Sequence, residues 1–361
     1  CGIDWLKEEN VMKIEQIVLS EKRKVTLTAY LQETGGEFRG LTQRPCILIL
    51  PGGAYEFCSD READPVAMPY LKAGYQVCIL RYSVKQYASW PQPLLDYEEA
   101  ITYIRNCAKE WHIDTEKVAV IGFSAGGHLA AAAATMANQR PNAVILGYAV
   151  TGEDVKGCNP TAPDTIAEID DRTPPVFLFA SRTDEVVPVI NSVKFMEGLI
   201  EKDISFESHI YSHGCHAFST CDPSLETPGS QISSRAVQWV DDSISWLADV
   251  MGTCGPEGER LPIVKAHITG DRLPFLSIDC TIGCIAESPE GNKIFQEFMS
   301  SADHAPKAEN AEKEPKNKME IMKHIPFRNM LSVMKVSDEI KEELDKKLSH
   351  IPNSRVKQEV K

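Results

Sequence analysis

The sequence predicts an α/β fold: a mostly parallel, eight-stranded sheet flanked by helices, followed by a small α-helical C-terminal domain. Two observations favour this fold class. Short continuous apolar runs alternate with helical stretches as far as residue 251, and only amphipathic helical patterns follow. Because continuous apolar runs suit strands covered on both faces, and β/α alternation favours parallel pairing, we expect a doubly wound sheet.

The expected strands and helices follow one another in a regular order. Residues 14–31 partly alternate apolar and polar side chains, which is typical of antiparallel strands with one solvent-facing side. Continuous apolar runs then predict strands at 45–50, 76–80 and 118–121, and the segments 143–148, 175–180 and 205–211 continue the series of expected strands. Helical spacing predicts helices at 64–73, 93–111, 187–202 and 234–251.

Domain boundaries are expected where the composition changes, because 361 residues exceed what one hydrophobic core usually organises. The changes predict a main domain at 12–251, a glycine-rich linker at 252–259 and a helical accessory domain at 260–361. We interpret residues 1–11 as a leader or vector-derived segment, because Met12 opens a natural domain start. Helices of the accessory domain are expected at 289–301, 317–324, 327–334 and 337–349, with a charged loop at 305–318.

The charge of the chain limits its partners. The formal net charge is −14, and no dense Lys/Arg stripe interleaved with aromatic residues is present. Such a surface repels phosphate backbones and anionic lipids, so neither nucleic acid nor a membrane is expected as a partner. A neutral substrate fits most easily, although a locally basic pocket could exist inside an acidic surface.

Eleven cysteines are neither dense nor regularly spaced, and several lie in apolar runs. Free thiols there behave as small hydrophobes, so we expect a reducing, cytoplasmic location. Cys280 and Cys284 have three residues between them, unlike the C-x₂-C of zinc sites, and no matching Cys/His pair follows. No metal or other cofactor is therefore predicted. Sequence patterns also indicate neither a membrane span nor a signal peptide.

Ser124 lies in a G-x-S-x-G pattern, Gly122-Phe-Ser-Ala-Gly126, between a buried apolar run and an alanine-rich helix. This context is typical of the nucleophile elbow of the α/β-hydrolase fold, where a sharp strand-to-helix turn exposes the serine and leaves room only for glycine beside it. The pattern alone is common, but the strand before it and the helix after it remove most chance matches. We therefore predict an α/β-hydrolase fold with Ser124 as the nucleophile.

A second loop follows the strand at 45–50 and carries Pro51-Gly-Gly-Ala-Tyr55. It is similar to the HGGG-type loop of these hydrolases, with Pro51 in place of His. Because small residues expose their N–H groups, those of Gly53 and Ala54 are predicted to form an oxyanion hole together with that of Ala125. An ordinary Pro-Gly-Gly turn is the alternative.

The acid and the base of a triad are expected in later loops, because the order in this fold is Ser, acid, His. Asp184 follows the strand at 175–180 and is the predicted acid, with Glu185 as the alternative. His216 follows the strand at 205–211 and is the predicted base, with His213 in the same loop as the alternative.

Several other residues are candidates for supporting or substrate-binding roles. His128, on the helix after the nucleophile, is expected to pack rather than to act as a base. Tyr55 follows the oxyanion loop, Tyr82 and Trp90 follow the second parallel strand, and His213 could line the pocket. Aromatic faces can stack on sugar rings, although packing in the core is an equal alternative for each aromatic residue.

The motifs PGGAY, GFSAGGHLA, SRTDEVVP and HGCHAF together resemble those of bacterial esterases of the hormone-sensitive-lipase-like and feruloyl/acetylxylan-esterase-like group of α/β-hydrolases. The resemblance covers residues 12–250 and implies hydrolysis of short acyl, commonly acetyl, or aryl esters, often on carbohydrate. Pro51 and Ala217 depart from the group's usual residues, which leaves the subgroup open.

The segments FLSIDCTIGCIAESPEGNKIF and HIPFRNMLSV resemble small helical modules attached to some bacterial glycosidases. That resemblance implies a cover for the site, a sugar contact or a homodimer formed through the C-terminal helices, with a plain packing domain as the alternative. The whole sequence predicts a serine esterase that acts on a small-molecule or oligosaccharide ester through an acyl-enzyme intermediate. The alternatives are a peptidase or amidase on the same fold and a catalytically silent carbohydrate-binding protein.

Overall fold

The computed structural model describes residues 12–36, 38, 40–225, 231–255, 258–300 and 322–356. The segment expected as a leader, the charged loop expected at 305–318 and most of the helix expected at 317–324 lie outside these residues. The chain divides into two compact units, Cys1–Ala266 and His267–Lys361, which we call unit 1 and unit 2. Among the described residues, no helix has the length and apolar character needed to cross a membrane.

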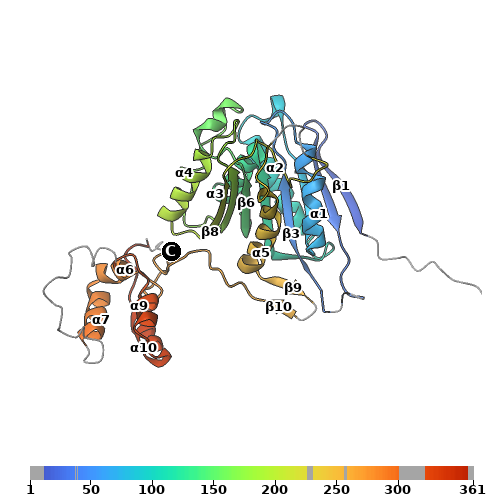
Figure 1. The fold of residues 1–361 in the computed structure, drawn as a ribbon. Coiled ribbons are helices and arrows are strands. Elements are labelled where there is room, and N and C mark those ends of the chain that lie inside the picture. The colour runs from blue at the N-terminus through green and yellow to red at the C-terminus, as the bar shows by residue number, and fades with distance from the viewer. Residues whose placement is uncertain are drawn as a thin grey trace, which may run out of the picture. The chain divides into compact units, whose positions relative to one another are not determined.

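Unit 1 is built on an eight-stranded sheet in the order β1-β2-β4-β3-β5-β6-β7-β8 (Figure 1). The strands are β1 Lys13–Ser20, β2 Val25–Leu31, β3 Arg44–Leu50, β4 Gln76–Arg81, β5 Ile113–Phe123, β6 Ala143–Gly147, β7 Val176–Ser181 and β8 Phe206–Tyr211. β1 and β2 pair antiparallel, β2 pairs antiparallel with β4, and all other pairs are parallel. The predicted α/β-hydrolase fold, with its mostly parallel sheet, is confirmed.

Helices cover both faces of this sheet. They are α1 Asp64–Lys72, α2 Gln92–Asn106, α3 Ser124–Thr135, α4 Ile190–Glu201 and α5 Trp239–Met251, with short 3-10 turns η1 Asp60–Glu62, η2 Lys85–Tyr87, η3 Glu153–Gly157 and η4 Ala236–Gln238. Side chains alternate along β3: Leu48 packs in the apolar cluster that contains α2, α3 and α4, whereas Ile47 and Ile49 pack in the cluster that contains α1 and α5. This two-sided burial explains the continuous apolar runs.

The carboxyl ends of the parallel strands share one edge of the sheet, and the β1–β2 turn lies at that same edge. β2 runs against the parallel strands, and Thr26 near its start pairs with Arg81 at the end of β4. The loops after β3, β4 and β5 leave the sheet at this edge too. In open parallel sheets the carboxyl edge is where ligands bind, so these loops are the place to look for a site.

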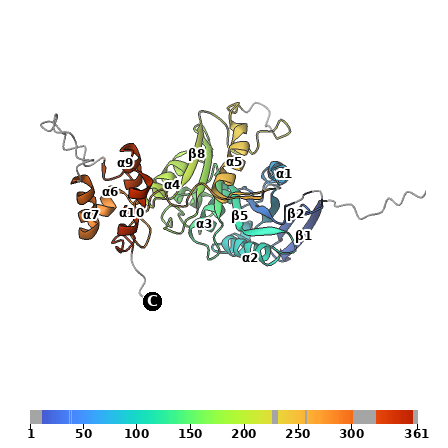
Figure 2. The ribbon, with the colours of Figure 1, turned by 90° about the horizontal axis from the view of Figure 1, so that it is seen from below.

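Unit 2 consists of α6 Ile282–Glu287, α7 Pro289–Ser300, α9 Phe327–Val333 and α10 Asp338–Leu348. These helices lie close together (Figure 2). Their apolar side chains form a core of their own. Phe327 is fully buried there, and its ring packs edge-on against Phe295 and Phe298. α7, α9 and α10 occupy segments predicted to be helical, whereas the six residues of α6 were not predicted.

The segment predicted to be a linker, residues 252–259, contains most of a small hairpin. β9 Thr253–Gly255 and β10 Gly258–Arg260 pair antiparallel, and the boundary between the units falls after Ala266. Gly252 has a φ angle of +74°, and a Cβ there would lie 2.1 Å from the carbonyl oxygen of Arg260. The glycine therefore serves a close approach of two backbone segments, which a composition pattern does not distinguish from a linker.

Candidate active site

Ser124 sits at a sharp turn between β5 and α3. Its φ angle is +51°, a left-handed conformation that costs a residue with a side chain about 1–2 kcal/mol. The glycines on either side are required by space: a Cβ on Gly122 would lie 2.1 Å from the carbonyl oxygen of Gly126, and a Cβ on Gly126 would lie 2.2 Å from that of Leu50. The local geometry is that of a nucleophile elbow.

The structure brings His216 and Asp184 to Ser124. His216 Nε2 lies 2.9 Å from Ser124 Oγ, and His216 Nδ1 lies 2.8 Å from Asp184 Oδ2. The Asp184 side chain is completely buried, and its other carboxylate oxygen accepts hydrogen bonds from the backbone N–H groups of Val186 and Val187 at 2.9 and 2.8 Å. A carboxylate can only accept from Nδ1–H, so Nε2 is left as the acceptor for the serine proton.

The alternative acid and base lie outside this chain of hydrogen bonds. Glu185 is exposed, and its carboxylate accepts from the backbone N–H of His216 at 3.3 Å. His213 is also exposed, and its Nδ1 lies 3.0 Å from Ser212 Oγ. Neither side chain shares a hydrogen bond with Ser124 in the structure.

Gly53 and Ala54 form a tight turn after β3. Their φ angles are +130° and +53°, and a Cβ on Gly53 would lie 2.2 Å from the carbonyl oxygen of Phe57. Across the described residues, no backbone acceptor is recorded for the N–H groups of Gly53 and Ala54. Ala125 lies in the first turn of α3, where N–H groups have no acceptor within the helix. All three donors are thus available to a bound group.

Glu62 is a buried carboxylate that was not among the residues predicted from the sequence. Its Oε2 accepts from the N–H of Gly52 at 2.7 Å, and its Oε1 accepts from the Tyr148 hydroxyl at 2.6 Å. The Tyr148 ring packs edge-on against His216, with 5.1 Å between ring centroids. Burial raises the pKa of Glu62, and the two hydrogen bonds oppose that rise. The bonded partners are 10 and 86 residues away in sequence, so no local pattern marks this residue.

The two tyrosines that were candidates for substrate binding, with core packing as the equal alternative, are buried and support the loops. Tyr55 and Tyr82 are 1% and 2% exposed. The Tyr55 hydroxyl bonds to His128 Nδ1 at 2.7 Å, and the Tyr82 hydroxyl donates to the carbonyl oxygen of Pro51 at 2.7 Å. Trp90 is half-buried and packs edge-on against His128, with 5.4 Å between ring centroids. Of these aromatic candidates, Trp90 keeps the most accessible surface.

His128 is buried in a single, neutral form. Its Nε2 lies 2.8 Å from the carbonyl oxygen of Pro163, which can only accept, so Nε2 carries the proton and Nδ1 accepts from the Tyr55 hydroxyl. Burial lowers the pKa of His128 to about 4, because desolvation disfavours the charged imidazolium. The residue therefore joins α3 to the loop after β3.

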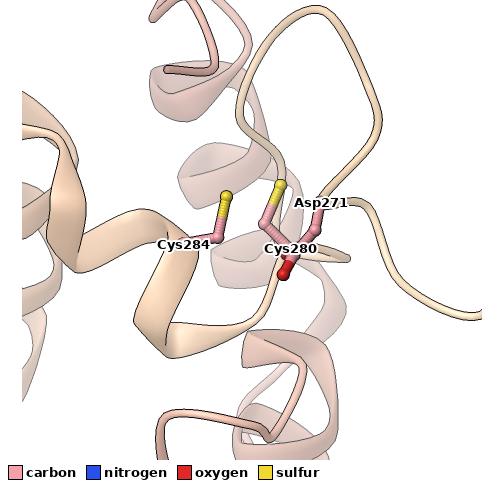
Figure 3. A group of neighbouring side chains, drawn as sticks. All are labelled: Asp271, Cys280 and Cys284. Atoms are coloured by element: carbon pink, nitrogen blue, oxygen red, sulfur yellow. The ribbon is translucent and has the colours of Figure 1, made fainter. Parts of the chain in front are cut away.

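Unit 2 contains a group of potential ligand residues, Asp271, Cys280 and Cys284 (Figure 3), whose ligand atoms lie within 4.8 Å of one another. The Asp271 carboxylate already accepts hydrogen bonds from the N–H and hydroxyl of Thr281 at 2.7 and 2.8 Å and from Arg355 Nη1 at 2.6 Å. The guanidinium would repel a cation here. The arrangement fits a structural link between the start of α6 and the end of unit 2.

Replacement of Gly126 by Ala is expected to destabilise unit 1 by about 3 kcal/mol or more, because the new Cβ would meet backbone atoms that no side-chain rotation can move. Gly157→Ala is the matched control, since a Cβ there meets nothing within 4 Å. Urea unfolding of both variants measures the difference. Equal stability of the two would contradict the packing described for the elbow.

The stability of unit 1 should depend on pH through His128. Its pKa is lowered from 6.5 to about 4 in the folded state, so the unfolded chain binds more protons between these values and the free energy of unfolding falls as pH falls through this window. Below pH 4 this loss of stability should reach on the order of 3 kcal/mol. The variant His128→Gln retains a donor and an acceptor but does not titrate, so its stability should not show this decrease. Urea unfolding of both proteins at several pH values checks it; a wild-type-minus-variant difference that stays constant with pH would speak against it.

The chain is similar to known esterases and to a xylanase. Residues 39–143 match the family model described as BD-FAE. Endo-1,4-beta-xylanase B of Butyrivibrio fibrisolvens is 32% identical over 211 residues, which are 50% of this chain and 33% of the xylanase. The acetylxylan esterase of Xylanibacter ruminicola is 26% identical over 223 residues, 55% of this chain and 45% of that esterase. The chain thus spans about a third to a half of the length of these curated relatives.

This chain is also similar to a solved structure, and the match covers nearly the whole length of that structure. MGS-M1, an alpha/beta hydrolase enzyme from a Medee basin deep-sea metagenome library, is 40% identical, and the match covers 67% of this chain and 99% of that one with a TM-score of 0.64. The similarities to BD-FAE and to an acetylxylan esterase also agree with the group predicted from the motifs. The chain therefore belongs to the α/β-hydrolase family.

Proposed function

We propose that this chain is a serine carboxylic ester hydrolase that removes acetyl or similarly short acyl groups from carbohydrate. The observation that carries the proposal is the continuous hydrogen-bond chain from Asp184 through His216 to Ser124. Similarity to an acetylxylan esterase supports an acetylated carbohydrate as the substrate. A short acyl group also leaves the carbohydrate part of the ester to supply most of the binding contacts.

In the first half of the reaction, Ser124 Oγ attacks the ester carbonyl carbon while His216 Nε2 takes the serine proton. Asp184 holds the imidazole in the required tautomer and stabilises its positive charge. The N–H groups of Gly53, Ala54 and Ala125 bind the oxyanion. His216 then gives its proton to the leaving alcohol oxygen, and the acyl group remains on the serine.

In the second half, His216 takes a proton from a water molecule, whose oxygen attacks the acyl carbon. The bond to Ser124 Oγ breaks, the proton returns to that oxygen, and the carboxylic acid leaves. One ester and one water are consumed, and one alcohol and one acid are released. No cofactor takes part in either half of this proposed reaction.

Ser124→Ala is expected to lower kcat/KM for p-nitrophenyl acetate by about 10⁴-fold or more, because the acyl-enzyme cannot form without the hydroxyl. Ser332→Ala, at an exposed serine of α9, is the control and should keep wild-type activity. Steady-state kinetics of the three proteins decide the matter. Full activity in Ser124→Ala would show that the nucleophile is another group.

Glu62→Gln is expected to lower kcat by about tenfold with a smaller effect on KM, because the amide NH₂ replaces one of the two oxygens that accept from the Gly52 N–H and the Tyr148 hydroxyl. The loops that carry the oxyanion donors and the base would then lose a shared anchor. Glu168→Gln removes the same charge from an exposed position and serves as the control. Matching kinetics for the two variants would exclude a positioning role for Glu62.

Acetylated xylo-oligosaccharides should be hydrolysed with a higher kcat/KM than feruloyl esters or p-nitrophenyl esters of longer acids. Release of acetate and of ferulate from matched substrates measures this preference. Faster cleavage of peptide or anilide amides than of any ester would favour a peptidase or amidase instead.

A further inference from the structure

A cleft of about 490 Å³ lies between the β1–β2 turn and the loops after β3 and β4. Its lining includes five cationic side chains, Lys22, Arg23, Lys24, Arg81 and Lys85, and one acidic side chain, Glu56. This excess of positive charge is unusual in a chain whose acidic residues outnumber its Lys and Arg by 52 to 38. The cleft is therefore a locally basic pocket on an acidic protein, which the net charge of the whole chain does not exclude.

The cleft lies beside the catalytic loops. The N–H of Glu56, in its wall, donates to the carbonyl oxygen of Gly53 at 2.8 Å, and such a turn keeps the two Cα atoms within about 7 Å. β4, whose end carries Arg81, neighbours β3, and β3 neighbours β5. Adjacent strands lie about 5 Å apart, so the cleft begins roughly 10 Å from the elbow along the same edge. A sugar next to the esterified one could reach it.

The two arginines of the cleft have partners and hold its walls together. Arg23 Nη2 lies 2.9 Å from Asp96 Oδ1, and Arg23 Nε donates to Ser83 Oγ at 3.1 Å. Arg81 Nη2 lies 2.6 Å from Asp60 Oδ1. These contacts join the β1–β2 turn and the loop after β3 to the segment after β4. Each arginine is paired with a carboxylate, so the two arginines have a structural role and do not account for the excess of positive charge in the cleft.

The three lysines supply the unmatched charge. Lys22, Lys24 and Lys85 are exposed, and across the described ranges no ion pair engages their side chains. The Lys85 backbone is held by its N–H, which donates to the carbonyl oxygen of Tyr55 at 2.7 Å. The lining thus contains three lysines without an ion-pair partner and one acidic side chain, Glu56, and this excess of positive charge favours a bound anion.

The cleft also offers aromatic surface. Phe57 is 58% exposed, and Tyr87 is half-buried in the same lining. An exposed aromatic ring can cover the apolar C–H face of a sugar, and an unpaired ammonium can pair with a carboxylate. A ligand that uses both features is a sugar ring with a carboxylate. We propose that this cleft binds a uronic-acid unit of the substrate, next to the ester cleaved at Ser124; this rests on the proposed function.

Two acetylated xylo-oligosaccharides, one with a single glucuronic acid branch and one with a single glucose branch, test the inference. Wild-type protein should have a higher kcat/KM for the acidic substrate. The triple variant Lys22→Gln/Lys24→Gln/Lys85→Gln should lower the acidic-to-neutral ratio about tenfold, as expected for several partly exposed ion pairs. The matched control Lys72→Gln/Lys109→Gln/Lys194→Gln makes the same charge change at exposed positions outside the cleft and should keep the wild-type ratio.

The outcomes separate this inference from the proposed function. If wild-type protein hydrolyses p-nitrophenyl acetate but treats the two oligosaccharides alike, the ester hydrolase stands and the uronic-acid site is wrong. An unchanged ratio in the cleft variant, or an equal fall in the control variant, also overturns the site. If inorganic phosphate suppresses the preference as effectively as glucuronate, the cleft is a general anion site and the sugar assignment is wrong. Absence of hydrolysis of any ester by wild-type protein overturns the proposed function itself.

Discussion

Backbone contact between the start of α3 and the end of β3 fixes the geometry of the site. Gly126 has no Cβ, and the carbonyl oxygens of Leu50 and Pro51 occupy the space that one would fill. The loop with the free N–H groups of Gly53 and Ala54 leaves β3 at this contact. One close approach therefore sets the position of the serine relative to the donors, and the buried strands on both sides hold the strained φ angle of Ser124 in place.

A second constraint is the buried carboxylate of Glu62. It accepts from the N–H of Gly52, in the loop after β3, and from the Tyr148 hydroxyl. That hydroxyl in turn accepts from the N–H of Ser219 at 3.1 Å, in the segment after His216. A buried polar group without a hydrogen-bond partner costs about 1–3 kcal/mol. Loss of any one of these hydrogen bonds would therefore favour displacement of the loops that they hold. Hydrogen bonds that include Glu62 therefore hold both the loop after β3 and the segment after β8.

Much of the fold could be predicted from the sequence because parallel strands buried on both faces leave continuous apolar runs, as β3 and β4 do. The candidate triad could be predicted because each of its residues follows a parallel strand in a fixed order, although β8, which precedes His216, is partly exposed and has no continuous apolar run. β5 begins at Ile113, five residues before the strand predicted at 118–121, because the polar residues 114–117 hide the start of the strand from an apolar pattern. The hairpin of β9 and β10 was missed because glycine marks close backbone contact as well as flexibility.

Other features depend on contacts that no local pattern carries. Glu62 and its partners meet only in the folded chain. Tyr55 and Tyr82 are aromatic residues in loops near the site, and only the structure shows that their hydroxyls are used inside the protein. α6 is six residues long and depends on a cap by Thr281 and on packing within unit 2, so its periodicity is too short to be recognised.

The joint action of Ser124, His216 and Asp184 is tested most directly by labelling with a fluorophosphonate, which reacts with an activated serine, followed by peptide mass spectrometry to locate the adduct. We expect one adduct per chain, on Ser124, formed much more slowly in the His216→Ala variant because the serine then lacks its base. Absence of an adduct, an adduct on another residue, or an unchanged labelling rate in His216→Ala would contradict the triad.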